Sequence, residues 1–351
     1  MRSPEGSPMR RRPTALLVLA ASGALLLGAC SSAAPAASPS PSATGERTLV
    51  VYSGRDKALI DPLIAKFQTA SGIKVETRYA GSTELAGQLL EEGANSPAQV
   101  FLSQDAGALG AVGEAKLLQT LPTEIAGKVP AKYTSTDGSW VGLTGRARVV
   151  AYDSQKHKAA DVPGDVTKFT EAKWKGKVGI APSNASFQAF VTAMRVSDGE
   201  AAAKTWLEGL KANDVKIFES NGDILEAVNS GTLDAGLINH YYWARSEQDP
   251  TKLRAQLKFG DAGTTSALVN VTGAGILTAK ASPEATEFVT WLLGEEAQTY
   301  FLTETYEYPL VGDQGPANVP ALKDLGGPEI DLSKLASLKE TVALITEAGL
   351  L

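Results

Sequence analysis

Residues 235–243, Ala-Gly-Leu-Ile-Asn-His-Tyr-Tyr-Trp, join a short apolar run to a cluster of aromatic side chains. The run 235–238 has the length and composition of a strand that is buried on both faces. Neighbouring residues of a strand point to opposite faces, so Tyr241 and Tyr242 can meet one ligand only where the strand has ended. Because α/β folds bind ligands at the carboxyl ends of their strands, the stretch predicts an α/β fold with a site at this pair.

Two phenol groups at one point suit a hard, highly charged cation. The phenol pKa is about 10, so a metal ion must displace the proton before the oxygen becomes a good ligand. A trivalent ion such as ferric iron does this well, and anionic oxygen ligands suit hard ions. The alternative interpretation is a partly exposed aromatic pair that covers the edge of a domain, and the residues alone leave both interpretations open.

Segments with strand and helix patterns alternate along the rest of the chain, which predicts βαβ units and parallel sheets. We expect a first set from residue 48 to 117, with a helix that begins at Asp61-Pro62. A second set runs from residue 177 to 238. Each set has its own alternation, so we expect two lobes.

Two runs can carry the chain between these lobes. Residues 148–152 leave the first set, and residues 268–277 can return to it. Two crossings form a hinge, and a cleft between two lobes is a favoured place for a ligand. The expected boundaries are 46–150 with 268–318 for lobe 1 and 151–267 for lobe 2. A C-terminal helical segment, 319–351, should pack on the lobes, with a final helix over about 332–350.

The first 45 residues have the pattern of a leader and a tether. Three arginines at 10–12 precede an apolar stretch over 15–29, which is typical of a secretory signal peptide over residues 1–29. Leu-Gly-Ala-Cys at 27–30 resembles the bacterial lipobox, which predicts a lipid-bearing Cys30. Residues 31–45 are rich in Ser, Ala and Pro and have the composition of a disordered tether.

The composition excludes several kinds of site and partner. Cys30 is the only cysteine, so an intramolecular disulfide and a Cys-based metal or redox site are excluded. Loss of residues 1–29 removes four arginines and one glutamate, which moves the net charge from −6 to about −9. An acidic body argues against nucleic acid as a partner. His157 and His240 are the only histidines and no nucleophile motif accompanies them, so we do not expect an enzyme.

With these motifs in view, the chain resembles the periplasmic-binding-protein superfamily and, within it, the ferric-ion-binding proteins of iron ABC transporters. The resemblance covers residues 46–318. It is carried by the segments Val-Tyr-Ser-Gly-Arg at 51–55, Val-Phe-Leu-Ser-Gln-Asp at 100–105, Arg-Val-Val-Ala-Tyr at 148–152, Ile-Asn-His-Tyr-Tyr-Trp at 238–243, Gly-Ala-Gly-Ile-Leu at 273–277 and Tyr-Glu-Tyr-Pro-Leu at 306–310. It implies an α/β, two-lobed type II fold with two crossing strands as its hinge.

The resemblance also implies a set of site residues. The ferric-ion ligands would be Tyr152, Tyr241 and Tyr242. Arg55 and Arg146 would hold a small anion, such as carbonate, that completes the metal's coordination. Where other members of the family have a histidine and a glutamate, this chain has Asp56 and Gln104. These two residues are therefore expected to lie near the anion or in the shell around the ligands.

The function implied by the resemblance is ferric-iron capture and delivery to an ABC permease. The protein would be a monomer, anchored through Cys30 on the extracellular face of the cell membrane. An alternative keeps the fold and changes the cargo to a small organic or anionic solute, of the thiamine, polyamine or phosphonate class. A third hypothesis is a surface adhesion or scaffold lipoprotein with a vestigial cleft.

Overall fold

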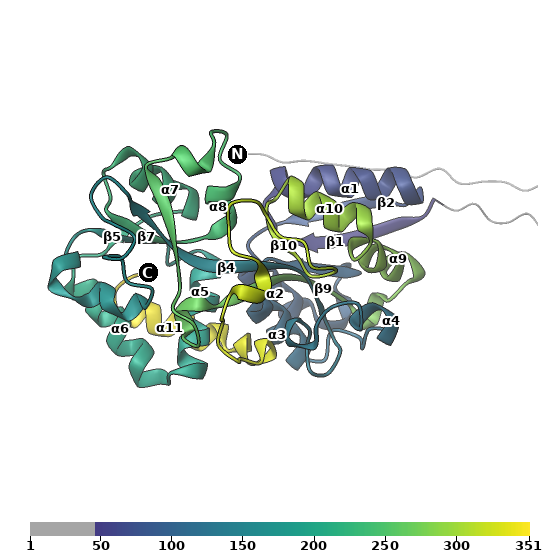
Figure 1. The fold of residues 1–351 in the computed structure, drawn as a ribbon. Helices are drawn as coiled ribbons and strands as arrows, with labels where there is room; N and C mark the ends of the chain where they lie inside the picture. Colours follow the sequence, from purple (N-terminus) through teal and green to yellow (C-terminus); the bar gives the residue numbers. More distant parts are fainter. Residues whose placement is uncertain (1–45) are drawn as a thin grey trace, which may run out of the picture. The chain divides into compact units, whose positions relative to one another are not determined.

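The computed structural model of the protein describes residues 46–351 (Figure 1). The predicted signal peptide, the lipidation site Cys30 and the tether to residue 45 lie outside the described residues. Within residues 46–351, no helix combines the length and the apolar composition that a membrane span requires.

Strands from both ends of the described chain build the first sheet. Its members are β1 (Thr48–Ser53), β2 (Lys74–Tyr79), β3 (Val100–Ser103), β9 (Val269–Ile276), β10 (Tyr308–Pro309) and the first half of β4 (Val141–Asp153). β1 is parallel to both β2 and β3. β9 then runs antiparallel to β3 and to β4, so the sheet is mixed.

The second sheet is assembled around the other half of β4. Its members are β5 (Val178–Ile180), β6 (Lys216–Ile217), β7 (Ala235–Asn239), β8 (Ala255–Phe259) and the second half of β4. β5 is parallel to β6 and β7, while β4 is antiparallel to β7 and β8. The predicted strands at 177–180, 215–218 and 235–238 are present, and β8 was not predicted.

β4 is the first connection between the two lobes. Ala147 is the last residue in register with β9, where it lies opposite Val269, and Arg148 is the first in register with β7, opposite Asn239. The chain returns through the segment that joins β8 to β9, which includes a short 3₁₀ turn at Thr265–Ala267. The predicted α/β class with two crossings between two lobes is confirmed.

Helices cover the sheets of both lobes (Figure 1). The first lobe contains α1 (Lys57–Ser71), α2 (Ser82–Glu92), α3 (Ala106–Glu114), α4 (Thr123–Ala126), α9 (Pro283–Leu292) and α10 (Glu295–Thr303). The second contains α5 (Ala185–Ser197), α6 (Glu200–Ala212), α7 (Asn221–Ser230) and α8 (His240–Ala244). α1 and α9 pack through Phe67 and Phe288, whose ring centroids lie 4.8 Å apart in an edge-to-face contact.

The first helix begins five residues earlier than the sequence predicts. A carboxylate oxygen of Asp56 accepts a hydrogen bond from the Ala58 N–H at 2.8 Å, which makes Asp56 the N-cap of α1. The expected cap, Asp61, and Pro62 lie inside the helix instead. The helix continues past the proline because one of its faces is buried, through Ile60, Leu63, Ile64 and Phe67.

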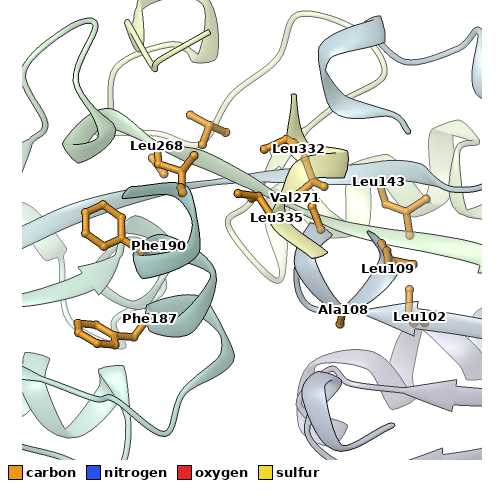
Figure 2. Packing of buried hydrophobic residues seen from close by; sticks show 14 of the residues in the cluster. Leu102, Ala108, Leu109, Leu143, Phe187, Phe190, Leu268, Val271, Leu332 and Leu335 are labelled. Atoms are coloured by element: carbon orange, nitrogen blue, oxygen red, sulfur yellow. The ribbon is translucent and has the colours of Figure 1, made fainter. Parts of the chain in front are cut away.

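The C-terminal segment contacts both lobes. The single helix expected over 332–350 is divided at Ser337 into a 3₁₀ helix, η9 (Leu332–Ala336), and α11 (Leu338–Glu347). η9 packs against α3 of the first lobe, and α11 packs against α5 of the second. Figure 2 shows Leu332 and Leu335 close to Val271 of β9, in the core between the lobes.

Candidate functional site

Tyr241 and Tyr242 lie directly after the end of a buried strand, as the sequence predicts. β7 ends at Asn239, and α8 begins at His240. The two phenol rings are stacked, with centroids 4.4 Å apart and planes 29° from parallel. Tyr241 is only 2% exposed, and Tyr242 is half-buried. The end of the strand therefore presents two phenols together at the carboxyl edge of the second sheet.

Positive charge surrounds this tyrosine pair. The guanidinium group of Arg245, which sequence reasoning missed, lies 5.8 Å from the ring centroid of Tyr241 and 5.2 Å from that of Tyr242. Burial and the neighbouring Tyr242 raise the pKa of Tyr241 above its ordinary value, while Arg55 and Arg146 act in the opposite direction. The phenol of Tyr241 is therefore protonated in the empty protein at neutral pH.

The two arginines expected to hold an anion meet at a buried carboxylate. A guanidinium nitrogen of Arg55 donates to Glu307 Oε1 at 2.9 Å, and Arg146 Nε lies 3.8 Å from the same oxygen. The other oxygen, Oε2, accepts hydrogen bonds from the hydroxyl groups of Thr144 at 3.0 Å and Thr305 at 3.3 Å. Glu307 was missed by the sequence reasoning, although it lies in the segment 306–310. The sequence feature that could have indicated a buried role for Glu307 is its position as a single acidic residue within a short apolar segment.

Side chains of the two lobes also contact each other directly. Gln104, which follows β3, donates from Nε2 to the hydroxyl oxygen of Ser186 on α5 at 3.1 Å. Thr83 on α2 donates to Gln188 on α5 at 3.2 Å. Both bonds join the first lobe to the second. The structure is therefore a closed arrangement, in which the first lobe covers the site carried by the second.

Tyr152 is not brought to the tyrosine pair, which corrects the expectation that it faces the same ligand. Tyr152 lies opposite Ala235, at the start of β7, whereas the pair follows Asn239 at the end of that strand. Arg148 is the residue of β4 that lies opposite Asn239, and Tyr152 is four positions further along the strand. Four steps along a strand correspond to about 13 Å.

Asp56 is also placed elsewhere. Its side chain is exposed and is used as the N-cap of α1, as described above. Of the two residues that replace the histidine and glutamate of other family members, only Gln104 lies at the junction of the lobes. Asp56 does not reach this junction because it lies at the start of a helix, where a carboxylate that accepts hydrogen bonds from backbone N–H groups is favourable.

His240 has a structural place next to the pair. Its Nδ1 accepts a hydrogen bond from the Ala147 N–H at 3.1 Å, and its ring stacks on Tyr308 with centroids 4.6 Å apart. Burial lowers the pKa of His240 to about 3, so the ring is neutral. The histidine thus links α8 to the point where β4 crosses between the lobes.

Two lobes, two crossing connections and a polar site closed between them define a two-lobed solute-binding protein. Residues 49–305 match the family model of bacterial extracellular solute-binding proteins, and the chain belongs to this family. The predicted resemblance is thereby confirmed at the level of the family and the fold.

The relatives of this chain include several iron-binding proteins. It is 33% identical to the Fe(3+)-binding periplasmic protein of Serratia marcescens, over 88% of this chain and 92% of the relative. It is also 33% identical to the major ferric iron-binding protein of Neisseria gonorrhoeae, over 93% of this chain and 98% of that relative. The iron-bound structure of HitA from Pseudomonas aeruginosa superimposes with a TM-score of 0.81 at 32% identity, over 86% of this chain and 99% of HitA. The family and these relatives are binding proteins, which confirms the expectation that the chain is not an enzyme.

Proposed function

We propose that this protein captures ferric iron with the phenolate oxygens of Tyr241 and Tyr242 and delivers it to an ABC permease. The observation that carries the proposal is the stacked tyrosine pair, closed between two lobes and surrounded by arginines. The names of the relatives from Serratia marcescens and Neisseria gonorrhoeae support the choice of cargo.

The charges at the site favour an anion as a further ligand of the iron. Two phenolates leave one positive charge on a ferric ion. Glu307 compensates only one of the two guanidinium charges of Arg55 and Arg146, so the loaded site keeps an excess of positive charge. A small anion such as carbonate would reduce this excess through charge-assisted hydrogen bonds. A structure of a relative from Trichodesmium, 27% identical with a TM-score of 0.71, is described as holding iron and citrate ligands.

Closure of the lobes supplies the mechanism of capture. The second lobe carries Tyr241 and Tyr242, so it can take the ion while the hinge is open. The first lobe then closes with Gln104 and Thr83 on α5, through the two hydrogen bonds described above. A permease that contacts both lobes binds the closed form differently from the open form, which provides the differential affinity that delivery needs.

The cellular setting follows from the start of the sequence. Lipidation at Cys30 would hold the protein on the extracellular face of the cell membrane, and residues 31–45 would act as its tether. The body would then stay near the membrane as a monomer.

Calorimetric titration tests the class of cargo. The protein is titrated separately with ferric citrate, thiamine, spermidine and a simple phosphonate, with citrate alone as the control for the chelator. Tight one-to-one binding of ferric citrate, with no heat from the organic solutes, is the expected result. Binding of one organic solute in place of ferric citrate would reassign the site to that solute. Binding of none would favour a scaffold protein.

A further inference from the structure

The C-terminal segment 332–347 packs between one helix of each lobe. Its first part, η9, contacts both α3 of the first lobe and α5 of the second, and α11 contacts the same two helices. Figure 1 shows α11, in yellow, next to α5. We call residues 332–347 the strap. It joins the lobes through side-chain and backbone contacts, in addition to the two crossings of the chain.

The strap lies directly on the backbone of α3. A β-carbon at Gly107 would lie 2.7 Å from the carbonyl oxygen of Leu335 and 3.0 Å from Cδ2 of Leu338. A β-carbon at Gly110 would lie 3.1 Å from the carbonyl oxygen of Ser333. A gap of about 0.5–1 Å removes a quarter to a half of the attraction between packed atoms. The strap therefore keeps this contact only while α3 stays in place beneath it.

The contact between the strap and α5 is polar and largely buried. Arg195 donates from Nη1 to the carbonyl oxygen of Ser337 at 2.9 Å and to the hydroxyl oxygen of Thr341 at 2.8 Å. The hydroxyl groups of Thr341 and Thr192, both 0% exposed, lie 2.7 Å apart. Because Thr192 donates its single proton to the carbonyl oxygen of Gln188 at 2.9 Å, Thr341 is the donor to Thr192. Thr341 therefore holds the strap on α5 through one accepted and one donated hydrogen bond.

The hydrogen bonds that join the lobes in the closed arrangement involve the same two helices. Gln104, which precedes the N-cap of α3, donates to Ser186 in the first turn of α5. Gln188, two residues further along α5, accepts from Thr83. A rotation of the lobes that separates Gln104 from Ser186 also moves α3 relative to α5. Since the strap is packed on both helices, it must lose contact with at least one of them when the lobes open.

We propose that the strap biases the hinge toward the closed arrangement, and that Thr341 is the positioning residue that holds it on α5. Opening exposes part of the buried surface of Leu335 or breaks the hydrogen bonds of Thr341, and either loss makes the open form less favourable. A ligand that binds between closed lobes then meets a population that is already partly closed, which raises its apparent affinity. The inference goes beyond the proposed function, because the strap acts in the same way for any cargo.

The open and closed populations of the ligand-free protein provide the first test. Pulsed electron–electron double resonance measures the distances between spin labels at two exposed positions, Glu91→Cys of α2 and Glu208→Cys of α6, in the full chain with Cys30→Ser. Thr341→Val keeps the shape of the side chain and removes its hydroxyl group. This variant should raise the ratio of open to closed molecules by roughly fivefold or more, as the loss of its hydrogen bonds requires.

Thr346→Val is the matched control for this substitution. Thr346 lies on the exposed face of α11, and its hydroxyl group donates to the carbonyl oxygen of Val342 within the same helix at 2.8 Å. The ratio of open to closed molecules should stay within about twofold of the wild type. A lower stability of Thr341→Val in urea with an unchanged open fraction would show that Thr341 has a structural role alone.

A substitution in α3 keeps the test decisive if Thr341→Val fails to fold. Gly107→Ala pushes the backbone at Leu335 away from α3, so it should also raise the open fraction. Gly87→Ala is its control, because a β-carbon at Gly87 in α2 would meet nothing within 4 Å, and the open fraction should not change.

The reactivity of a thiol between the lobes extends the test to rare open states. Ser186→Cys, in the chain with Cys30→Ser, replaces a residue that is 4–6 residues before Thr192 on α5 and 5% exposed in the closed arrangement. Its rate of reaction with a maleimide follows the open fraction when opening is fast, so Thr341→Val should increase the rate by the same factor as the ratio. Rates and ratios within about twofold of the wild type in both Thr341→Val and Gly107→Ala would overturn the proposal. A wild type in which all ligand-free molecules are open would overturn it as well.

Discussion

Arg55 and Glu307 form an ion pair of 2.9 Å whose two side chains are 1% and 0% exposed. Arg55 follows the opening strand of the first lobe, and Glu307 immediately precedes β10 near the end of that lobe. The pair therefore joins two distant parts of the chain at the surface that covers Tyr241. Glu307 compensates the charge of Arg55. The charge of Arg146 is only partly balanced, because its Nε lies 3.8 Å from Glu307 Oε1.

Replacement of Glu307 by Gln should destabilise the protein strongly. The substitution keeps the shape and leaves the guanidinium group of Arg55 buried without a counter-charge, which costs about 3–5 kcal/mol in unfolding free energy. Urea denaturation of the iron-free protein measures the change. Glu91→Gln removes an exposed carboxylate and should change stability by less than about 0.5 kcal/mol. Equal stabilities of the two variants would contradict the importance of the buried pair.

Substitution of two helical glycines by alanine can separate the effect of packing against the C-terminal segment from the effect of helix propensity. A β-carbon at Gly107 in α3 would lie 2.7 Å from the carbonyl oxygen of Leu335, whereas at Gly87 in α2 it would meet nothing within 4 Å. Gly107→Ala should therefore destabilise by about 1–3 kcal/mol through overpacking. Gly87→Ala should stabilise by about 0.5–1 kcal/mol. Urea denaturation of both variants measures this, and the same sign for both would show that η9 does not pack closely on α3.

The hydrogen bond from Thr83 to Gln188 should slow the release of iron. Thr83→Val removes this contact between the lobes and leaves the tyrosine pair intact. A typical net hydrogen bond contributes about 0.5–1.5 kcal/mol, so release should become roughly 2–10 times faster. Stopped-flow transfer of iron to a strong chelator gives the rate. Thr123→Val, at an exposed position, is the matched control, and an unchanged rate in Thr83→Val would argue against this contact as part of closure.

Iron affinity should fall steeply in acid. The pKa of Tyr241 is raised in the empty protein, so its phenol is protonated below pH 10 and must lose that proton when iron binds. Release of one proton from each phenol changes the affinity by about 100-fold per pH unit between pH 5 and 8. Competition with a chelator, corrected for the chelator's own protonation, measures the slope. An affinity independent of pH would contradict ligation by phenolates.

The sequence predicted those parts of the fold that depend on local pattern. The strands around Val51, Phe101 and Leu237 are apolar runs of strand length, and all three are present. The start of α1 was wrong because Asp56 and Asp61 are both good caps, and only the structure shows that the earlier one is used. The short strand β10 has two residues and no periodicity from which to predict it.

The site was only partly predictable, for a different reason. Tyr241 and Tyr242 are adjacent in the sequence, so the end of one strand is sufficient to place them together. The position of Tyr152 depends on the antiparallel register of β4 and β7, which pairs residues more than 80 positions apart. The buried charges of Glu307 and Arg148 depend in the same way on partners that are distant along the chain. No local pattern encodes such contacts.

Capture of iron by the tyrosine pair is tested most directly by an absorbance titration with ferric citrate, with and without bicarbonate. The wild type is compared with Tyr241→Phe, Tyr242→Phe and Tyr152→Phe. The proposal predicts a visible phenolate-to-iron band that saturates at one equivalent, disappears in both variants of the pair and persists in Tyr152→Phe. A wild-type protein without a band under any anion, or a band that survives in both Tyr241→Phe and Tyr242→Phe, would contradict it.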